Sequence, residues 1–97
     1  MQEIKIKTNK SDQAVTILQE AIKTEELRLE HALNIAQKRL ENFEKKYGVP
    51  SKVFINEWSS EDLEKRDIEY VEWAGEFKMF LRLKERLSIL QGIEYVT

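Results

Sequence analysis

The side chains best suited to hold a metal or move a proton are few in this chain and lie far apart. His31 is the single histidine among 97 residues, and there is no cysteine. The Glu-x-x-His spacing of di-iron helical bundles is broken, because Arg28 stands three residues before that histidine. Thiolate chemistry is excluded by composition. We therefore expect no metal site and no cofactor.

Hydroxyl and carboxylate side chains also lack a catalytic arrangement. The serines are at positions 11, 51, 59, 60 and 88, and none has a histidine and an acid in a suitable context. The first four stand where helix caps are expected. Adjacent acids such as Glu25 with Glu26 are typical of exposed helix faces. The sequence predicts no catalytic residue and a protein that is not an enzyme.

One enzymatic alternative depends on cations. Small chorismate mutases line a helical cavity with arginines and lysines, and Arg28, Arg39 and Lys84 could play that part. The match with that family is limited to the type of charge. Exposed cations are also common on helices in general, so these three residues alone do not distinguish an enzyme. This alternative predicts an anion-binding cavity between helices.

A second alternative is a DNA-binding regulator of its own operon. Lys5 and Lys7, or the cations around Lys45, would contact phosphates. The net charge of -2, from 16 basic and 18 acidic residues, gives no general attraction to nucleic acid. A ribbon-helix-helix protein also needs a glycine-bearing turn after about a dozen helical residues, and none occurs before Gly48.

Composition indicates one helical domain over residues 1–97. The chain is 41% hydrophobic and 35% charged, which is unlike disordered chains and similar to proteins built from long helices. No run approaches the roughly 18 apolar residues of a membrane span, and the first residues lack the basic head and apolar run of a signal peptide. We expect a cytoplasmic protein that does not use a membrane.

The first long helix is predicted over residues 12–47. That stretch has neither glycine nor proline, and Gly48 and Pro50 follow it as stop signals. At about 100° per residue its apolar side chains form one straight stripe, which comprises Ala14, Val15, Leu18, Ala21, Ile22, Leu29, Ala32, Leu33, Ala36, Leu40, Phe43 and Tyr47. Glu25 interrupts the stripe, and we expect it to form a buried charge pair with Lys84, or with Arg86, across the hairpin.

A short helix at 51–58 and a second long helix at 60–91 are predicted next, with Ser51 and either Ser59 or Ser60 as caps and Gly92 as the stop. The apolar residues of the second long helix do not keep to one stripe. Gly75 in its middle indicates either the close approach of another backbone or a glycine tolerated on the surface of the helix. The alternating residues at 1–10 and 93–97 form either short paired strands or loose tails.

These elements predict an all-α antiparallel hairpin of two long helices with a short helix between them. A helix that is apolar on several sides must be covered on several sides, and one neighbour covers only one of them. We therefore expect a homodimer that completes a helical bundle, or a different protein partner. The candidate interface or packing residues are Leu29, Phe43, Phe54, Trp73, Phe77, Phe80, Leu81 and Leu87.

The run Phe43-Glu-Lys-Lys-Tyr-Gly48, with Ser51, Phe54, Trp73-Ala74 and Leu81-Arg-Leu-Lys84, resembles a group of small helical prokaryotic antitoxin-like proteins encoded beside small toxins. The resemblance covers residues 36–90. Val49-Pro50 departs from the methionine-serine that usually follows the glycine. The resemblance implies a protein partner, a toxin, whose active site the helical hairpin occludes or distorts, and it transfers no catalytic residue.

Overall fold

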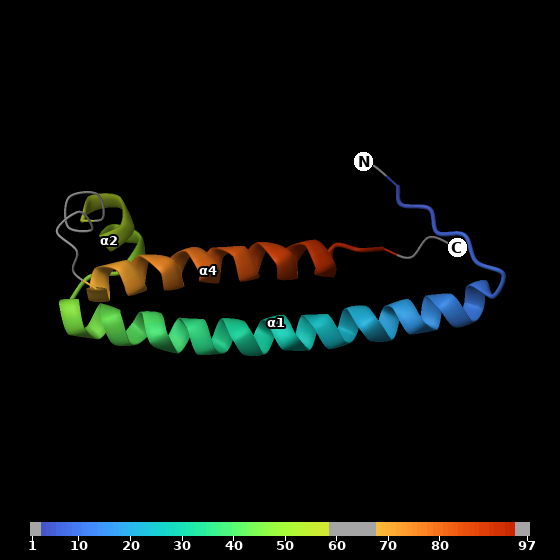
Figure 1. Cartoon of the computed structure of the whole chain (residues 1–97), viewed down its shortest axis with the longest axis horizontal. Helices are drawn as coiled ribbons and strands as arrows, with labels where there is room; N and C mark the ends of the chain where they lie inside the picture. The colour runs from blue at the N-terminus through green and yellow to red at the C-terminus, as the bar shows by residue number, and fades with distance from the viewer. Residues whose placement is uncertain (1–2, 59–67, 95–97) are drawn as a thin grey trace.

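The computed structural model describes residues 3–58 and 68–94, and this part of the chain forms three helices (Figure 1). They are α1 (Ser11–Tyr47), α2 (Ser51–Glu57) and α4 (Ile68–Gln91). The long helices α1 and α4 pack against each other in opposite directions, and α2 packs on them at the end where the chain turns. The predicted helical hairpin with a short intervening helix is confirmed. None of these helices is long and apolar enough to cross a membrane.

Helix α1 presents its apolar side chains in one straight stripe, as its sequence predicts. Leu29, Ala36 and Leu40 are buried. The remaining stripe residues are half-buried, except Ala21, which is exposed. The stripe faces α4 along most of its length, so α1 has a single packing surface.

The turn after α1 depends on Gly48. Its backbone is left-handed, with φ 71° and ψ 21°, and its N–H donates to the carbonyl oxygen of Glu44 at 2.8 Å. Few residues other than glycine adopt this conformation without strain. Pro50 is extended, and α2 starts directly after it. The predicted end of the first helix at Gly48 is confirmed.

Ser51 does not cap α2 as predicted, because its side chain has a different partner. The Ser51 hydroxyl accepts a hydrogen bond from the indole Nε1 of Trp73 at 2.9 Å, in a buried position. The backbone N–H of Ser51 donates instead to a Glu44 carboxylate oxygen at 2.7 Å. A buried indole N–H without an acceptor costs free energy, so the Ser51 hydroxyl accepts from Trp73 rather than capping the start of α2.

Aromatic rings fill the core at the turn end of the hairpin. Trp73 is fully buried, and the ring of Phe54 stacks on it with centroids 3.9 Å apart and planes 5° apart. Phe43 and Tyr47 stack on the same indole at 5.6 and 5.5 Å. Tyr70 makes edge contacts with Phe54 and Tyr47. Trp73 therefore joins all three helices.

Helix α4 carries apolar side chains on more than one side, as predicted. Trp73 and Ala74 are buried. A row of partly covered residues continues toward the C-terminal end: Phe77, Phe80, Leu83, Leu87 and Leu90. Other large apolar side chains are between 49% and 73% exposed: Ile68, Val71, Met79, Leu81 and Ile89. Helix α1 thus covers only part of the apolar surface of α4.

Two predictions at the helix boundaries have different outcomes. The second long helix is confirmed from Ile68 to Gln91, whereas its predicted start and the caps Ser59 and Ser60 lie outside the described residues. Of the two alternatives for the ends of the chain, paired strands or loose tails, residues 3–10 and 93–94 show the second, because they form no strand.

The molecule is elongated rather than globular. Its radius of gyration is 18.9 Å and its extents are 58 × 24 × 18 Å, whereas a globular chain of about 100 residues has a radius of gyration of about 13 Å. The two helices thus lie in a single layer, which leaves much of their surface open to solvent.

A polar cluster joins the end of α1 to the start of α4. The Lys46 ammonium group donates to both carboxylate oxygens of Glu69, at 2.6 and 2.7 Å. The Tyr47 hydroxyl donates to the same carboxylate. The hydrogen bonds from Lys46 and then Tyr47 hold the pKa of Glu69 below its usual value of 4.5.

This cluster should make folding stability depend on pH in acid. Because folding lowers the pKa of Glu69, its contribution is complete above about pH 4.5 and is lost as the pH falls through the lowered value. Glu69→Gln should therefore reduce the urea midpoint at pH 7 and have a smaller effect at pH 3. The control is Glu72→Gln, which changes an exposed carboxylate on the same helix. An equal effect of Glu69→Gln at both pH values would contradict the assignment.

Candidate functional site

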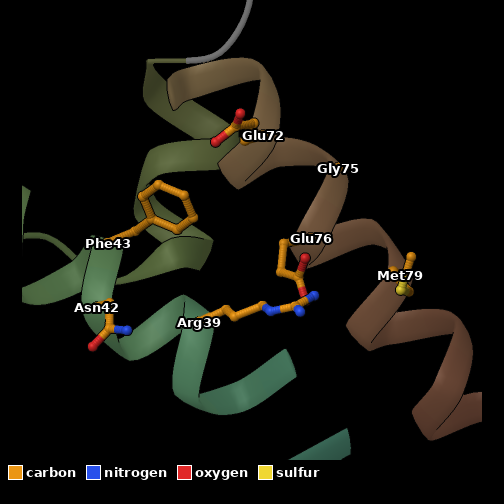
Figure 2. A pocket seen from close by; sticks show the side chains of 7 residues that line it. All are labelled: Arg39, Asn42, Phe43, Glu72, Gly75, Glu76 and Met79. Carbon is orange, nitrogen blue, oxygen red and sulfur yellow. The ribbon is translucent and has the colours of Figure 1, made fainter. Parts of the chain in front are cut away.

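A shallow hollow lies between α1 and α4 (Figure 2). We call it the α1–α4 hollow and define it by its lining: Arg39, Asn42, Phe43, Glu72, Gly75, Glu76 and Met79. On both helices these residues recur at spacings of three and four, so each group shares one helix face. Glu44, which binds the start of α2, points to the other side of α1 from Asn42. We infer that α2 covers the opposite side of the hairpin and leaves the hollow open.

The floor of the hollow is apolar. The Phe43 ring is half-buried and rests on the buried indole of Trp73. Met79 is 53% exposed, and an added Cβ at Gly75 would meet nothing within 4 Å. The backbone of α4 is therefore bare at Gly75, and another molecule could approach it closely there.

Opposite charges meet across the hollow. The Arg39 guanidinium lies 3.6 Å from a carboxylate oxygen of Glu76, which is only 15% exposed. Figure 2 shows the arginine reaching from α1 toward α4 at this point. Asn42 and Glu72 complete a polar border. An apolar floor with a polar border is the usual make-up of a protein-binding surface.

The side chains that the sequence analysis weighed for metal binding or catalysis do not gather at the hollow. Among residues 3–58 and 68–94, no group of three or more histidine, cysteine, aspartate or glutamate side chains could hold a metal ion. Of the three cations that the enzymatic alternative requires, only Arg39 lines the hollow. Arg28 is bonded to Glu25, and the Lys84 ammonium lies 5.5 Å from the centre of the Phe80 ring.

The predicted charge pair between Glu25 and Lys84 does not form. The Glu25 carboxylate instead accepts a hydrogen bond at 2.6 Å from Arg28, one turn along the same helix, and it is about one-third exposed. This hydrogen bond, with a smaller effect from the charge of Arg86, lowers the pKa of Glu25. A neighbour at i+3 is always within reach on a helix, so it takes precedence over a side chain across the hairpin.

The candidate packing residues divide between core and surface. Leu29, Phe54 and Trp73 are buried, and Phe77 and Phe80 are half-buried against the core. Leu87 is half-buried and Leu81 is 49% exposed. Phe43 is the one member of the predicted set that lines the hollow.

Sequence reasoning missed four lining residues of the hollow, namely Asn42, Glu72, Glu76 and Met79. Their helical spacing is visible in the sequence. Which face of α4 lies beside Arg39 and Phe43 is set by the packing of the two helices, and the spacing alone does not show it.

No protein-family model, curated protein or solved structure matches this chain. The function is therefore inferred from the surfaces of the molecule itself.

Two glycine substitutions should have opposite effects on stability. Gly48→Ala places a Cβ on a left-handed residue and should lower the free energy of unfolding by about 1 kcal/mol. Gly75→Ala adds a better helix former where nothing obstructs it, and should raise that free energy by about 0.5–1 kcal/mol. Urea denaturation followed by helical circular dichroism would measure both. A destabilising Gly75→Ala would show that the α4 backbone is already in contact with a neighbour.

Proposed function

We propose that the protein is a non-enzymatic protein-binding module that docks its partner on the α1–α4 hollow. One observation carries this proposal: large apolar side chains on α4 beside the hollow are open to solvent, with Ile68, Val71 and Met79 73%, 52% and 53% exposed. A hairpin with this much open surface, part of it apolar, is suited to holding another protein.

The side chains beside the hollow suggest what the partner presents. Ile68 and Val71 are 73% and 52% exposed on α4, and with Gly75 and Met79 they recur at helical spacing on the side of α4 away from Trp73. This stripe is the kind of surface on which an amphipathic helix docks. The bare backbone at Gly75 allows a bulky apolar side chain of the partner to sit between Phe43 and Met79.

The resemblance to antitoxin-like proteins suggests one such partner, a small toxin encoded beside this chain. In that case the mechanism is occlusion, in which the hairpin covers or distorts the active site of the toxin. The paired charges and apolar floor of the hollow fit such a role, because occlusion needs a stable contact and no catalytic group.

The proposal predicts how substitutions change binding to the product of the neighbouring gene, measured by calorimetry. Met79→Glu places a charge in the apolar floor and should raise the Kd at least about tenfold. Leu81→Glu is the matched control, because Leu81 is similarly exposed but points to a different side of α4. Gly75→Ala should weaken binding several-fold even though it stabilises the free chain.

The control variant makes the outcome specific. If the neighbouring product binds and Leu81→Glu alone abolishes binding, the site lies on another side of α4. If the neighbouring product does not bind at all, the antitoxin role is contradicted.

A further inference from the structure

Helix α4 has two rows of side chains with the spacing of a coiled coil, and only one row packs against α1. The first row advances in alternating steps of three and four residues, and its members are buried or half-buried: Trp73, Glu76, Phe80, Leu83, Leu87 and Leu90. The second row consists of the residues immediately before these, and all of them are exposed: Glu72, Gly75, Met79, Arg82, Arg86 and Ile89. We call the second row the open row. Ile68 extends it by one turn and is also exposed.

The two rows face directions nearly at right angles, because adjacent positions on a helix are about 100° apart. A helix in a four-helix bundle has this property, since it packs against two neighbours. Helix α1 is one such neighbour, and no described residue covers the open row. The open row is about 30 Å long at 1.5 Å per residue, which is enough for three heptads.

The open row lies on the same side of the hairpin as the α1–α4 hollow. Three of its members, Glu72, Gly75 and Met79, line the hollow (Figure 2). The missing second neighbour of α4 would therefore cover the hollow as well.

We propose that the open row binds the open row of a second copy of this chain, antiparallel and about a two-fold axis at Met79, so that two hairpins form a four-helix bundle. The inference rests on the protein-binding role proposed above and names one occupant of the hollow side. In a two-fold contact, if one residue meets another, the second also meets the first. The open row must therefore be complementary to its own reverse.

The line through the axis is complementary in charge. Glu72, Met79 and Arg86 are one heptad apart, so they lie in one line along the helix and face the contact together. Reversal about Met79 places each Glu72 beside Arg86 of the second copy and gives two pairs of opposite charge. Among the described residues neither Glu72 nor Arg86 has an ion pair. The second copy supplies an oppositely charged partner for each.

The neighbouring line is complementary in shape. Ile68, Gly75, Arg82 and Ile89 are again one heptad apart. Reversal places Ile68 beside Ile89 of the second copy, and these side chains are 73% and 62% exposed in the single chain. It also places the stem of Arg82 over Gly75, where an added Cβ would meet nothing within 4 Å. The bare backbone thus receives the longest side chain of the open row.

The order of the charges selects the antiparallel orientation. In a parallel pair of α4 helices, Glu72 would lie beside Glu72, Arg82 beside Arg82 and Arg86 beside Arg86. Like charges directly across a helix contact are destabilising. The antiparallel pair avoids all three of these contacts.

Helix α1 gives an independent check at the same level of the hairpin. Both ion pairs between the long helices show the same register, which places Met79 opposite Ala36. Ile35, the residue next to Ala36, is 40% exposed and lies on the hollow side of α1. A two-fold axis at Met79 therefore brings Ile35 beside Ile35 of the second copy. Each long helix has an exposed apolar side chain where the axis passes.

The cations of α1 are kept apart in this bundle. About an axis near Ile35, Arg39 lies beside Ala32 of the second copy, and Arg28 lies beside Asn42. Each of these arginines thus meets a small or neutral side chain and not another cation. The hollow side of α1 is compatible with the contact that the open row of α4 defines.

Self-association on this side covers the hollow. A second copy and a different protein partner would therefore exclude each other, and a partner that docks on the hollow would displace the second copy. The free chain would be a dimer.

Cross-linking tests the axis directly, because the chain has no cysteine of its own. Met79→Cys should give a covalent dimer with a short bis-maleimide reagent, since the two thiols meet at the axis. Leu81→Cys is the matched control, because Leu81 is 49% exposed against 53% for Met79 and points to a different side of α4. It should remain largely monomeric on a denaturing gel. Equal cross-linking of both variants, or none of Met79→Cys, would overturn the proposal.

Charge exchange tests the orientation by analytical ultracentrifugation at low salt. Glu72→Arg or Arg86→Glu alone should each weaken the dimer by about tenfold, because two attractive pairs become two repulsive ones. The double variant restores both pairs and should recover the dimer. Glu30→Arg makes the same change in net charge as Glu72→Arg, but on the other side of α1, and should have no effect.

The outcomes separate this inference from the partner-binding role. A wild-type chain that stays monomeric at high concentration, or a double variant that dimerises no better than the single ones, would overturn the self-association. Binding of the neighbouring product is measured separately by calorimetry, so its absence contradicts the antitoxin role and not the dimer. Helical circular dichroism and tryptophan fluorescence show in each variant that the hairpin is intact.

Discussion

A pair of side-by-side helices can bury only the line along which they touch, and the rest of this structure depends on that constraint. Helix α1 satisfies this constraint because its apolar side chains form one straight stripe, whereas α4 carries apolar side chains on several sides. The core is correspondingly small: Leu29, Ala36, Leu40, Phe54, Trp73 and Ala74 are its buried hydrophobic residues in the described part of the chain. The uncovered apolar surface is the basis of the binding proposal.

The two ends of the hairpin are held together by different kinds of contact. At the turn, large aromatic rings around Trp73 and the cluster of Lys46, Tyr47 and Glu69 hold three helices together. Toward the open end the contacts are aliphatic, and α1 extends past the end of α4. Packing contacts within the chain are therefore concentrated near the turn, and the surface open to solvent increases with distance from the turn.

Much of the fold could be predicted because its signals are local. The stripe of α1 follows from periodicity, and its end follows from Gly48. The partners of Ser51 and Glu25 could not be predicted, because each side chain had two suitable uses and tertiary packing chose between them. The hollow was missed for a related reason: it joins faces of two helices whose relative rotation is set by the aromatic packing at Trp73.

The order of the α1–α4 contacts along the hairpin also has a consequence for how the chain reaches its native state. Contacts near the turn join residues close in sequence, so little loop-closure entropy opposes them, whereas contacts at the open end close a much longer loop. Assembly should therefore start at the aromatic end and proceed along the helices like a zipper. The contacts at the open end then form last, on a hairpin whose two long helices are already joined at the turn.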